Sequence, residues 1–575
     1  MKMIFKISML LMIGVIVLSI FPIKINAQQC GLYNFYATKD ATTAKLVDTT
    51  GALYKIWTFS SANKYSAYLI PGDTIVRTTS YTVAGAPSGG GVTGKIQKIT
   101  WNGTVAWEYT YSSTTTQMHH DICPMPNGNV LFISYDVKTA TQATQAGSST
   151  SSTFYSEKIV EIKPTGPTSG TIVWEWKLWD HMCQNYNSAK DNYVTSIINN
   201  SQLLNINYVG TGNLPDRYHM NGLDYNAELD QIVLSMHFMN SAFIIDHSTT
   251  NAEAAGHIGG NSGKGGDFLY RWGNPASYGA TGTTMFNTIH DAHWISSDHP
   301  TYPNYLCGYK NNNPPTMSQI VIWNPPYNGY NYSLTLGQAY EPSNYAYQYT
   351  CTFAASNEGN SQQLPNGNMM VNNFQGSSYE VNSAGTVLQT IVNSKSSHAY
   401  RYSKCYVRGP IAIASATLTE VPAGTDVTIS SAATSVTETN PTYTYEWSSG
   451  QSTSSAIVTP TTTTTYIVTV TNTSLGCSDT ASVTINVTAT RINEIVDNNT
   501  FNIFPNPTNG NLTIEGTFLE NISNFKVVVY NSCGKTVLQI TNSISIDLSG
   551  YEDGMYFLTL TSGEKIISQK INLLK

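Results

Sequence analysis

A short strand, a tight turn and a second strand recur along most of this 575-residue chain. Several of the turns carry Asn-Gly or Pro-Gly, and Asn-Gly accepts the backbone angles of a two-residue hairpin. One form of the unit runs from the turn into an apolar strand, and a second form with an aromatic strand follows most of its occurrences. The first form is YLIPGDTIVRT (68–78), ICPMPNGNVLFIS (122–134) and SQQLPNGNMMVNN (361–373), and the second is KITWNGTVAWEYTY (98–111), IVEIKPTGPTSGTIVWEWKLW (159–179) and SYEVNSAGTVLQTI (378–391).

Two hairpins in sequence make a four-stranded antiparallel sheet, which is one blade of a β-propeller. Helical periodicity is almost absent after the first residues, so the sequence predicts an all-β protein. Residues 28–408 are long enough for six blades with insertions, since a minimal blade needs about 40–45 residues. We therefore predict a six-bladed propeller at 28–408, an Ig-like sandwich at 409–490 and a small sandwich at 492–575.

The amino terminus has the pattern of a secretory signal peptide at residues 1–27. Lys2 and Lys6 precede an apolar run over 7–21, and the small residue Ala27 precedes the expected cut. The run of about fifteen residues is short for a membrane span, and no later stretch is as apolar, so we expect no transmembrane span in the mature chain. Glutamines rather than small residues precede Cys30, which argues against lipidation.

The amino-acid composition limits the kinds of partner that the chain is expected to bind. The formal net charge is −7, only 11% of residues are charged, and no basic run follows the signal region, which argues against nucleic acid and anionic membranes as partners. The eight cysteines show no CxxC spacing, so disulfides or buried thiols are expected. Cys30 and Cys405 bracket the first long region, and their pairing is one hypothesis.

The last two regions carry no chemical motif. PTYTYEWSSGQSTSSAIVTPTTTTTYIVTVTN (441–472) alternates strictly around a lone Trp447, and its region resembles the Ig-like repeats of bacterial surface proteins. The final segment, with FNIFPNPTNGNLTIEG (501–516), KVVVYNSCGKTV (526–537) and a GMY strand, resembles the C-terminal sorting domain of the type IX secretion system of the Bacteroidetes. That resemblance implies type IX machinery as a partner and a secreted or cell-surface location.

Three short motifs hold five of the 11 histidines: MHHD (118–121), YHMNGLDY (218–225) and IHDAHW (289–294). A single histidine in a β protein is most often structural, and a polar loop would explain HMN equally well. A zinc site needs three or four ligands, and no HExxH or CxxC pattern completes one, so we predict neither a metal nor another cofactor. Each motif, however, lies near a predicted strand end, where propeller loops converge on the axis.

The motifs belong to a longer resemblance. Residues 28–408 resemble the bacterial arylsulfotransferases, which are PAPS-independent. The matching segments, in the family's order, are MHHDICPMPNGNVLF (118–132), WEWKLWDHMCQN (174–185), RYHMNGLDYNAELDQIVLSMHFMNSAFIIDHSTT (217–250), GGDFLYRWGNP (265–275), IHDAHWI (289–295) and QQLPNGNMM (362–370). The resemblance implies a six-bladed propeller that moves a sulfuryl group from a small aromatic sulfate to a phenolic acceptor through a sulfated histidine.

Site residues follow from the same resemblance. It places the nucleophile on His290 and further catalytic groups on His219, Asn221 and His120. His237 stands where the family commonly has an arginine, which is the main departure. We also expect His119, His293 and Arg271 to bind substrate.

The chemistry suits these residue types. Sulfuryl transfer resembles phosphoryl transfer, in which charge spreads over the equatorial oxygens. A neutral imidazole is a competent nucleophile near pH 7, and each fixed donor to the developing charge contributes about 3–4 kcal/mol. The alternative is a non-catalytic secreted propeller that binds surface glycans or other extracellular ligands, which His237 and the adhesin-like tail favour. Release of phenol from an aryl sulfate distinguishes the two.

Overall fold

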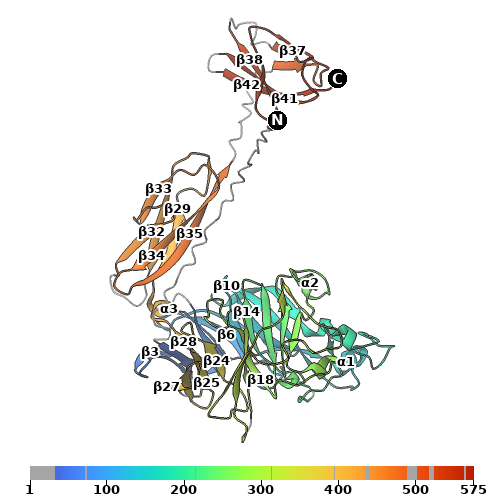
Figure 1. Cartoon of the computed structure of the whole chain (residues 1–575), viewed down its shortest axis with the longest axis vertical. Coiled ribbons are helices and arrows are strands. Elements are labelled where there is room, and N and C mark those ends of the chain that lie inside the picture. Colours follow the sequence, from blue (N-terminus) through green and yellow to red (C-terminus); the bar gives the residue numbers. More distant parts are fainter. Residues whose placement is uncertain are drawn as a thin grey trace, which may run out of the picture. The chain divides into compact units, whose positions relative to one another are not determined.

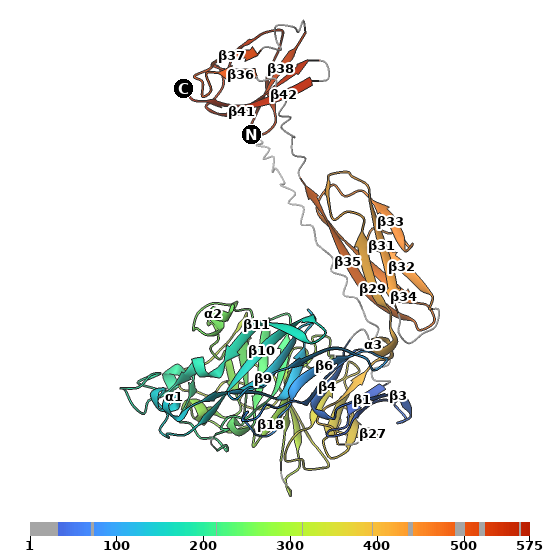
Figure 2. The same ribbon diagram turned by 180° about the vertical axis from the view of Figure 1, so that it is seen from behind.

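The computed structural model describes residues 33–70, 74–213, 215–312, 314–393, 395–434, 441–488, 501–516, 524–562 and 565–575. The predicted signal peptide (1–27) and Cys30 lie outside these residues. Within them, the protein is nearly all β (Figures 1 and 2).

Six four-stranded antiparallel sheets form the blades of a propeller between residues 33 and 402. The first strand of each sheet contacts the first strand of the next, as the inner strands of a propeller do. In order from the inner strand, the sheets are β28 (Ala399–Tyr402), β1 (Tyr33–Ala37), β2 (Thr43–Asp48) and β3 (Leu53–Thr58); β4 (Asn63–Ile70), β5 (Thr74–Ser80), β6 (Gly94–Ile99) and β7 (Val105–Thr110); β8 (Thr116–Pro124), β9 (Val130–Lys138), β10 (Phe154–Gly166) and β11 (Ser169–Lys177); β14 (Met220–Asn226), β15 (Gln231–Met236), β16 (Ser241–Asp246) and β17 (Tyr270–Trp272); β18 (Ile289–Trp294), β19 (Leu306–Lys310), β20 (Gln319–Trp323) and β23 (Tyr347–Thr350); and β24 (Asn360–Gln363), β25 (Met369–Asn373), β26 (Ser377–Val381) and β27 (Val387–Val392).

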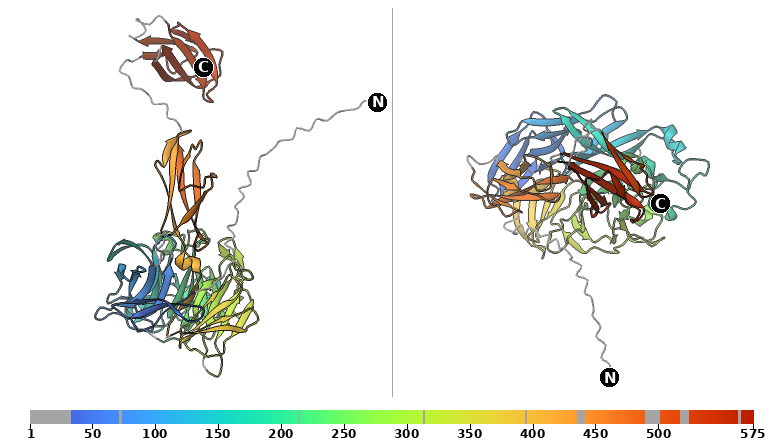
Figure 3. Two further views of the ribbon diagram at one scale, coloured as in Figure 1. Left: turned by 90° about the vertical axis from the view of Figure 1, so that its left-hand side faces the viewer. Right: turned by 90° about the horizontal axis from the view of Figure 1, so that it is seen from above.

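The first blade closes the ring. Its inner strand, β28, comes from the end of the propeller sequence and pairs antiparallel with β1 from the beginning, with Tyr33 opposite Tyr402. Figure 3 shows the blue and yellow ends of the propeller next to one another. This pairing gives both terminal strands a hydrogen-bonded neighbour and joins the two ends of the propeller sequence in one blade.

The predicted hairpins are confirmed. Each of the six quoted segments contributes two adjacent antiparallel strands, from β4–β5 to β26–β27. Gly128 and Gly367 in the Asn-Gly turns have positive φ (85° and 82°), the conformation that those turns require. The register therefore follows directly from the local turn chemistry.

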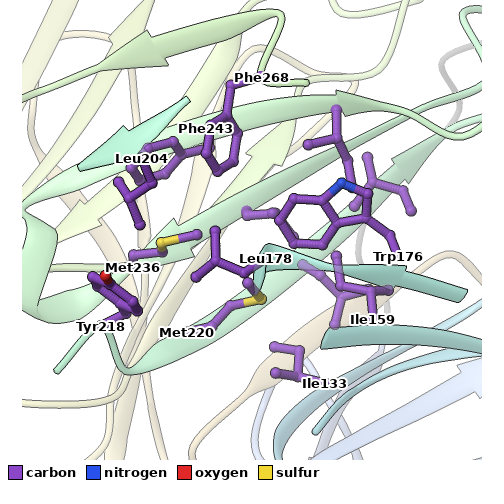
Figure 4. Close-up of a cluster of buried hydrophobic side chains, with 14 of the residues drawn as sticks. Ile133, Ile159, Trp176, Leu178, Leu204, Tyr218, Met220, Met236, Phe243 and Phe268 are labelled. Carbon is purple, nitrogen blue, oxygen red and sulfur yellow. The ribbon is translucent and has the colours of Figure 1, made fainter. Parts of the chain in front are cut away.

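Apolar side chains fill the space between neighbouring blades. One such cluster, between the sheets of β8–β11 and β14–β17, is buried almost completely and contains Trp176, Leu178, Met220, Phe243 and Phe268 (Figure 4). It fixes the third and fourth blades against each other, and these blades carry two of the three histidine motifs on their inner strands.

The segments between the sheet strands contain short elements of their own. They contain the two-stranded pairs β12 (Met182–Cys183) with β13 (Leu204–Asn205) and β21 (Tyr327–Asn328) with β22 (Asn331–Tyr332), the helices α1 (Ala140–Gln145), α2 (Asn251–Ala254) and α3 (Lys404–Arg408), and the 3-10 turns η1 (Leu178–His181), η2 (Ile198–Asn200), η3 (His237–Met239) and η4 (Pro275–Tyr278). Among the described residues, no helix has the length and apolar character to span a bilayer.

One cysteine prediction is wrong. Cys405 in α3 forms a disulfide with Cys477, the first residue of β35, and not with Cys30. Sequence order misled the assignment, because α3 follows the last propeller strand and a later strand supplies the partner. Of the other described cysteines, Cys183, Cys307 and Cys351 are buried thiols, as the sequence led us to expect.

After α3, seven strands form two sheets, with the orders β29-β31-β33 and β30-β35-β34-β32. Their number agrees with the expected Ig-like topology, and Trp447 is buried. The strands are β29 (Ile411–Ala416), β30 (Glu420–Pro422), β31 (Val427–Thr434), β32 (Tyr443–Trp447), β33 (Ser455–Val458), β34 (Thr464–Asn472) and β35 (Cys477–Thr488).

The carboxy-terminal domain has two further sheets around its own apolar core. Its strands are β36 (Phe501–Phe504), β37 (Asn511–Gly516), β38 (Lys526–Asn531), β39 (Thr536–Thr541), β40 (Ser545–Asp547), β41 (Gly554–Ser562) and β42 (Lys565–Leu573). The orders are β36-β37-β40 and β39-β38-β41-β42. The boundaries at 409 and 492 remain predictions.

Candidate active site

The inner strands are irregular where the histidine motifs lie. β8, β14 and β18 each contain a break in register, between His119 and Ile122, Met220 and Gly222, and His290 and His293. Left-handed residues accompany the breaks: φ is 50° at His120, 54° at His219 and 52° at Asp291. Each non-glycine residue in this conformation costs about 1–3 kcal/mol, so strain accumulates at the propeller axis, as it does at many functional sites.

Five imidazole rings form a continuous chain. Ring centroids are 5.1 Å apart for His119 and His120, 4.5 Å for His120 and His219, 5.6 Å for His219 and His237, and 5.0 Å for His237 and His290. The structure therefore brings together residues from three successive blades, from His119 to His290. Direct contact between these rings allows several of them to approach one small group.

Hydrogen bonds fix the tautomer of His290. Its Nδ1 lies 2.6 Å from Oδ1 of Asn311, whose own amide nitrogen donates to the carbonyls of Ala355 and Glu358. Oδ1 must therefore accept, which places the imidazole proton on Nδ1. Nε2 then holds the lone pair and accepts a long hydrogen bond, 3.3 Å, from the Glu358 amide. His290 thus has its unprotonated nitrogen at Nε2.

His219 has a carboxylate partner. Its Nδ1 lies 2.6 Å from Oδ2 of Asp216, and the Tyr135 hydroxyl donates to the same oxygen at 3.0 Å. Burial alone would raise the pKa of Asp216, but the hydrogen bonds from His219 and Tyr135 lower it. The ionised Asp216 accepts the hydrogen bond from Nδ1 of His219, which leaves Nε2 of His219 directed away from the carboxylate.

A second relay ends at His120. Nε2 of His119 lies 2.9 Å from Oε2 of Glu157, and Nδ1 of His119 lies 2.8 Å from Nδ1 of His120. Burial, and then the charge of Asp216, raises the pKa of Glu157 well above its usual value, so its carboxyl keeps the proton. Glu157 then donates to His119 and His119 donates to His120, which leaves His120 with an N–H at Nε2.

Within the chain of five rings, His237 has an unpaired ring nitrogen. Its Nδ1 is buried and has no hydrogen-bond partner within the described residues. The residue begins η3, and its amide donates to the carbonyl of His219 at 3.0 Å, which fixes its backbone beside that residue. An unpaired buried nitrogen is costly, so this atom is a candidate contact for a bound ligand.

Burial keeps most of these rings neutral. It lowers the pKa of His119 to about 3 and, with the neighbouring His219, that of His237 to about 4. The pKa values of His120 and His290 also lie well below the usual value, first because of burial and then because of neighbouring imidazoles. At neutral pH the site therefore offers neutral imidazoles, including an unprotonated Nε2 on His290.

A glycine segment lies against the cluster. A Cβ at Gly90 would come within 2.6 Å of the His219 ring, and one at Gly91 within 2.4 Å of the His120 ring. Gly91 also has φ of 63° and accepts a 2.7 Å hydrogen bond from the His120 amide. Only glycine permits this close approach, which holds both rings in place.

Both polar atoms of the Asn221 side chain are hydrogen-bonded within the protein. Its side-chain nitrogen donates to the carbonyl of Ile289 at 2.8 Å, and its oxygen accepts from the Ser235 hydroxyl at 2.6 Å. The residue is fully buried. Its amide therefore ties β14 to the residue before His290, and the catalytic role expected from the sequence stays a prediction.

Two of the three expected substrate-binding residues, Arg271 and His119, have side chains engaged in hydrogen bonds within the protein. Arg271 is on the outer strand β17, and its guanidinium donates to the carbonyls of Ser201, Leu203 and Ser277, so it braces loops. His119 lies behind His120, with both ring nitrogens engaged. Substrate binding by these two residues stays a prediction.

His293 lines a separate axial cavity of about 270 Å³. Its Nε2 bonds Gln363 and its Nδ1 faces Asp291. Asp121, Asp224 and Asp291 also line this cavity, and burial raises the pKa of Asp224 to about 6. Because the five contacting rings do not line it, the structure does not place His293 among them.

The model of the arylsulfotransferase (ASST) family matches residues 24–401, which is most of the chain. The chain belongs to the arylsulfotransferase family. For this arylsulfotransferase-family member, aryl sulfotransferase activity is the function that the match supports. Among curated proteins, none matches the sequence.

The model of the secretion system C-terminal sorting domain matches residues 502–573. This domain directs export through the type IX system to the cell surface or the medium. It coincides with the strands from β36 to β42, which form a unit with its own core.

Several solved structures are similar to this chain at low sequence identity. A putative 6-phosphogluconolactonase from Bacteroides fragilis is 12% identical, with 65% of this chain and 99% of that chain covered and a TM-score of 0.33. A periplasmic gluconolactonase from Pseudomonas aeruginosa is 12% identical, covers 64% and 99%, and has a TM-score of 0.33. The Cps50 (Swd1) β-propeller domain from Myceliophteria thermophila is 9% identical, covers 64% and 83%, and has a TM-score of 0.31. The propeller architecture follows from the sheet order rather than from these values.

Sequence reasoning missed the residues behind the rings. Asp216 lies three residues before His219, a spacing that could have suggested the pair. Glu157 is an acid inside the apolar strand FYSEKIVEI, which signals a buried, partnered carboxyl. Asn311 and Glu358 give no local signal, because they reach His290 from other strands and loops.

Proposed function

We propose that the chain transfers a sulfuryl group from an aryl sulfate to a phenol through a sulfohistidine on Nε2 of His290. The observation that carries this proposal is the tautomer of His290: the Asn311 oxygen holds the proton on Nδ1, and burial keeps Nε2 unprotonated. A nucleophile fixed in one orientation is what an in-line displacement at sulfur requires.

In the first half of the reaction, the Nε2 lone pair forms a bond to sulfur as the sulfur–oxygen bond to the aryl group breaks. The departing phenolate oxygen takes a proton from His219, whose imidazolium form the ionised Asp216 supports. The Nε2 proton of His120 and the unpaired nitrogen of His237 are the donors for the sulfuryl oxygens.

In the second half, a phenolic acceptor replaces the first phenol. Its hydroxyl proton returns to His219 while its oxygen bonds to sulfur and the nitrogen–sulfur bond breaks. The enzyme is restored, and one aryl sulfate and one phenol have exchanged the sulfuryl group. The two halves predict ping-pong kinetics.

Mass spectrometry of the protein mixed rapidly with an aryl sulfate, without acceptor, tests the proposal. We expect a phenol burst and the mass of one sulfuryl group on the peptide that contains His290. Addition of a second phenol should remove the label. A turnover-competent protein whose label maps to another residue would contradict the assignment, and a protein that binds aryl sulfates without phenol release would favour the non-catalytic alternative.

A further inference from the structure

A second group of histidines lies next to outer strands of the third and fourth blades, away from the inner strands. His181 ends η1, after the outer strand β11, while His257 and Asp267 belong to the loop between α2 and β17. Nδ1 of His181 and Nδ1 of His257 both approach Oδ1 of Asp267, at 2.9 and 2.7 Å. One donor atom from each of the three residues lies within 4.8 Å of the others.

The hydrogen bonds of His181 orient a lone pair into this group. Nε2 of His181 lies 2.8 Å from the carbonyl oxygen of Ala254, which can only accept, so Nε2 carries the proton. In a neutral ring, Nδ1 of His181 then carries a lone pair, and this lone pair points at a lone pair of the Asp267 oxygen. Such a contact is repulsive unless a proton or a metal cation lies between the two atoms.

The surroundings hold the ring rigidly. Trp176, which Figure 4 shows in the core cluster, stacks on His181 with an interplanar angle of 3°, and its indole nitrogen donates to Gly266. His181 and Asp267 are buried, whereas 58% of the His257 side chain is exposed. The group therefore has two fixed members and one at the surface, with solvent available as a further ligand.

We propose that His181, His257 and Asp267 bind one zinc ion, with water in the fourth position. Two imidazole nitrogens and one carboxylate oxygen are a donor set that zinc prefers, and tetrahedral zinc places its ligands about 3.3 Å apart, close to the contacts already present. The carbonyl of Ala254 is the outer partner that fixes the tautomer of His181.

The consequence is structural. The loop from Gly256 to Gly266 contains six glycines, whose ordering costs more backbone entropy than that of other residues. A bound ion would tie this loop to η1 and to the outer edge of the third blade. This site is independent of the sulfuryl-transfer proposal, because it uses none of the five rings at the axis.

Calorimetric titration of the chelator-treated full chain with zinc chloride tests the site. We expect one zinc per chain and a higher thermal midpoint with zinc. His257→Ala, which changes an exposed side chain, should weaken binding by at least about 100-fold, since even outer-shell changes cost about 10–100-fold. Ile258→Ala is the matched control, because Ile258 is an exposed neighbour without a donor atom, and it should bind as the wild type does.

Asp267→Asn provides a second variant that keeps the size and hydrogen-bonding capacity of the side chain, with circular dichroism to establish folding. A folded Asp267→Asn protein should also lose zinc binding. A wild type that binds no zinc, or a His257→Ala protein that binds it as tightly as the wild type, would overturn the proposal and leave a hydrogen-bonded His–Asp–His group.

Discussion

The propeller axis and the seam between the third and fourth blades use the same side chain in opposite charge states. At the axis, His290 has imidazole and amide neighbours, and burial keeps its pKa well below the usual value. At the seam, Nδ1 of His247 lies 2.6 Å from Asp230 and its Nε2 lies 3.1 Å from Glu161. Burial alone would lower the pKa of His247, but the two carboxylates raise it to about 9.

The difference shows how the surroundings of a histidine set its charge state. Two carboxylates turn a histidine into a fixed cation that joins strands, since both ring nitrogens must donate. At the axis, the hydrogen-bond partners of His290 are amides rather than carboxylates, and burial keeps this imidazole neutral with a lone pair on Nε2. Left-handed backbone occurs in both places, at His120 and His219 by the axis and at Asp230 by the seam.

The substitution His290→Ala tests most directly whether the neutral histidine at the axis forms the covalent intermediate. We expect loss of sulfuryl transfer by at least about 10³-fold, because alanine removes the atom proposed to bond to sulfur. Initial rates of phenol release measure the effect. His257→Ala serves as the histidine control away from the axis and should retain activity; comparable activity of the two variants would rule out the covalent role of His290.

Substitution of Glu157 tests whether the axis is neutral. Glu157→Gln mimics a protonated carboxyl, since its amide can donate to His119, and should keep activity within about threefold. Glu157→Leu removes the relay and should lower kcat by about 100-fold, in line with the loss of a positioned donor. If glutamine were as damaging as leucine, the ionised form of Glu157 would be required instead, and His120 would hold the other tautomer.

The seam predicts a pH-dependent stability. The pKa of His247 is raised in the folded protein, so its stabilisation is fully present below about pH 6.5 and is lost as the pH rises through about 9. The loss should amount to roughly 2–3 kcal/mol. Denaturant titrations between pH 6 and 10 measure it, and His247→Gln should flatten the slope over this range. An unchanged slope in that variant would mean that other groups set the pH dependence.

The smallest expected effect concerns His237 at the propeller axis. His237 has a pKa of about 4 and is neutral at pH 7, whereas arginine is always charged and donates two parallel hydrogen bonds. His237→Arg should therefore raise kcat/KM a few-fold, provided that the variant folds. His237→Gln, a neutral control, should give no increase. A folded arginine variant with lower activity would assign His237 a role of its own.

Much of the fold followed from the sequence because hairpins are local. The Asn-Gly turns at 127–128 and 366–367 and the alternating strands beside them set both the strand boundaries and the register. The closing pair of β1 and β28 could not be read in this way, because its two strands are separated by nearly the whole propeller. The predicted disulfide of Cys405 was wrong for a similar reason, because its partner Cys477 lies 72 residues further along the chain.

The candidate site divides along a similar line. The identities of His120, His219, His237 and His290 came from short motifs, and the structure brings these rings into contact. Arg271 belonged to an equally recognisable motif, GGDFLYRWGNP, yet its guanidinium is used by loop carbonyls. A motif shows that a residue matters, but it does not distinguish a ligand contact from a brace.

By itself, the sequence determined the β architecture, the repeat of hairpins, the sorting domain and the residue types at the axis, because each depends on neighbours within about ten positions. Only the tertiary structure decided the protonation states and tautomers. Burial and partners from distant strands, such as Asn311 for His290 and Glu157 for His119, set those states. Proton positions depend on the local field and on hydrogen-bond geometry, and both exist only once the blades have closed around the axis.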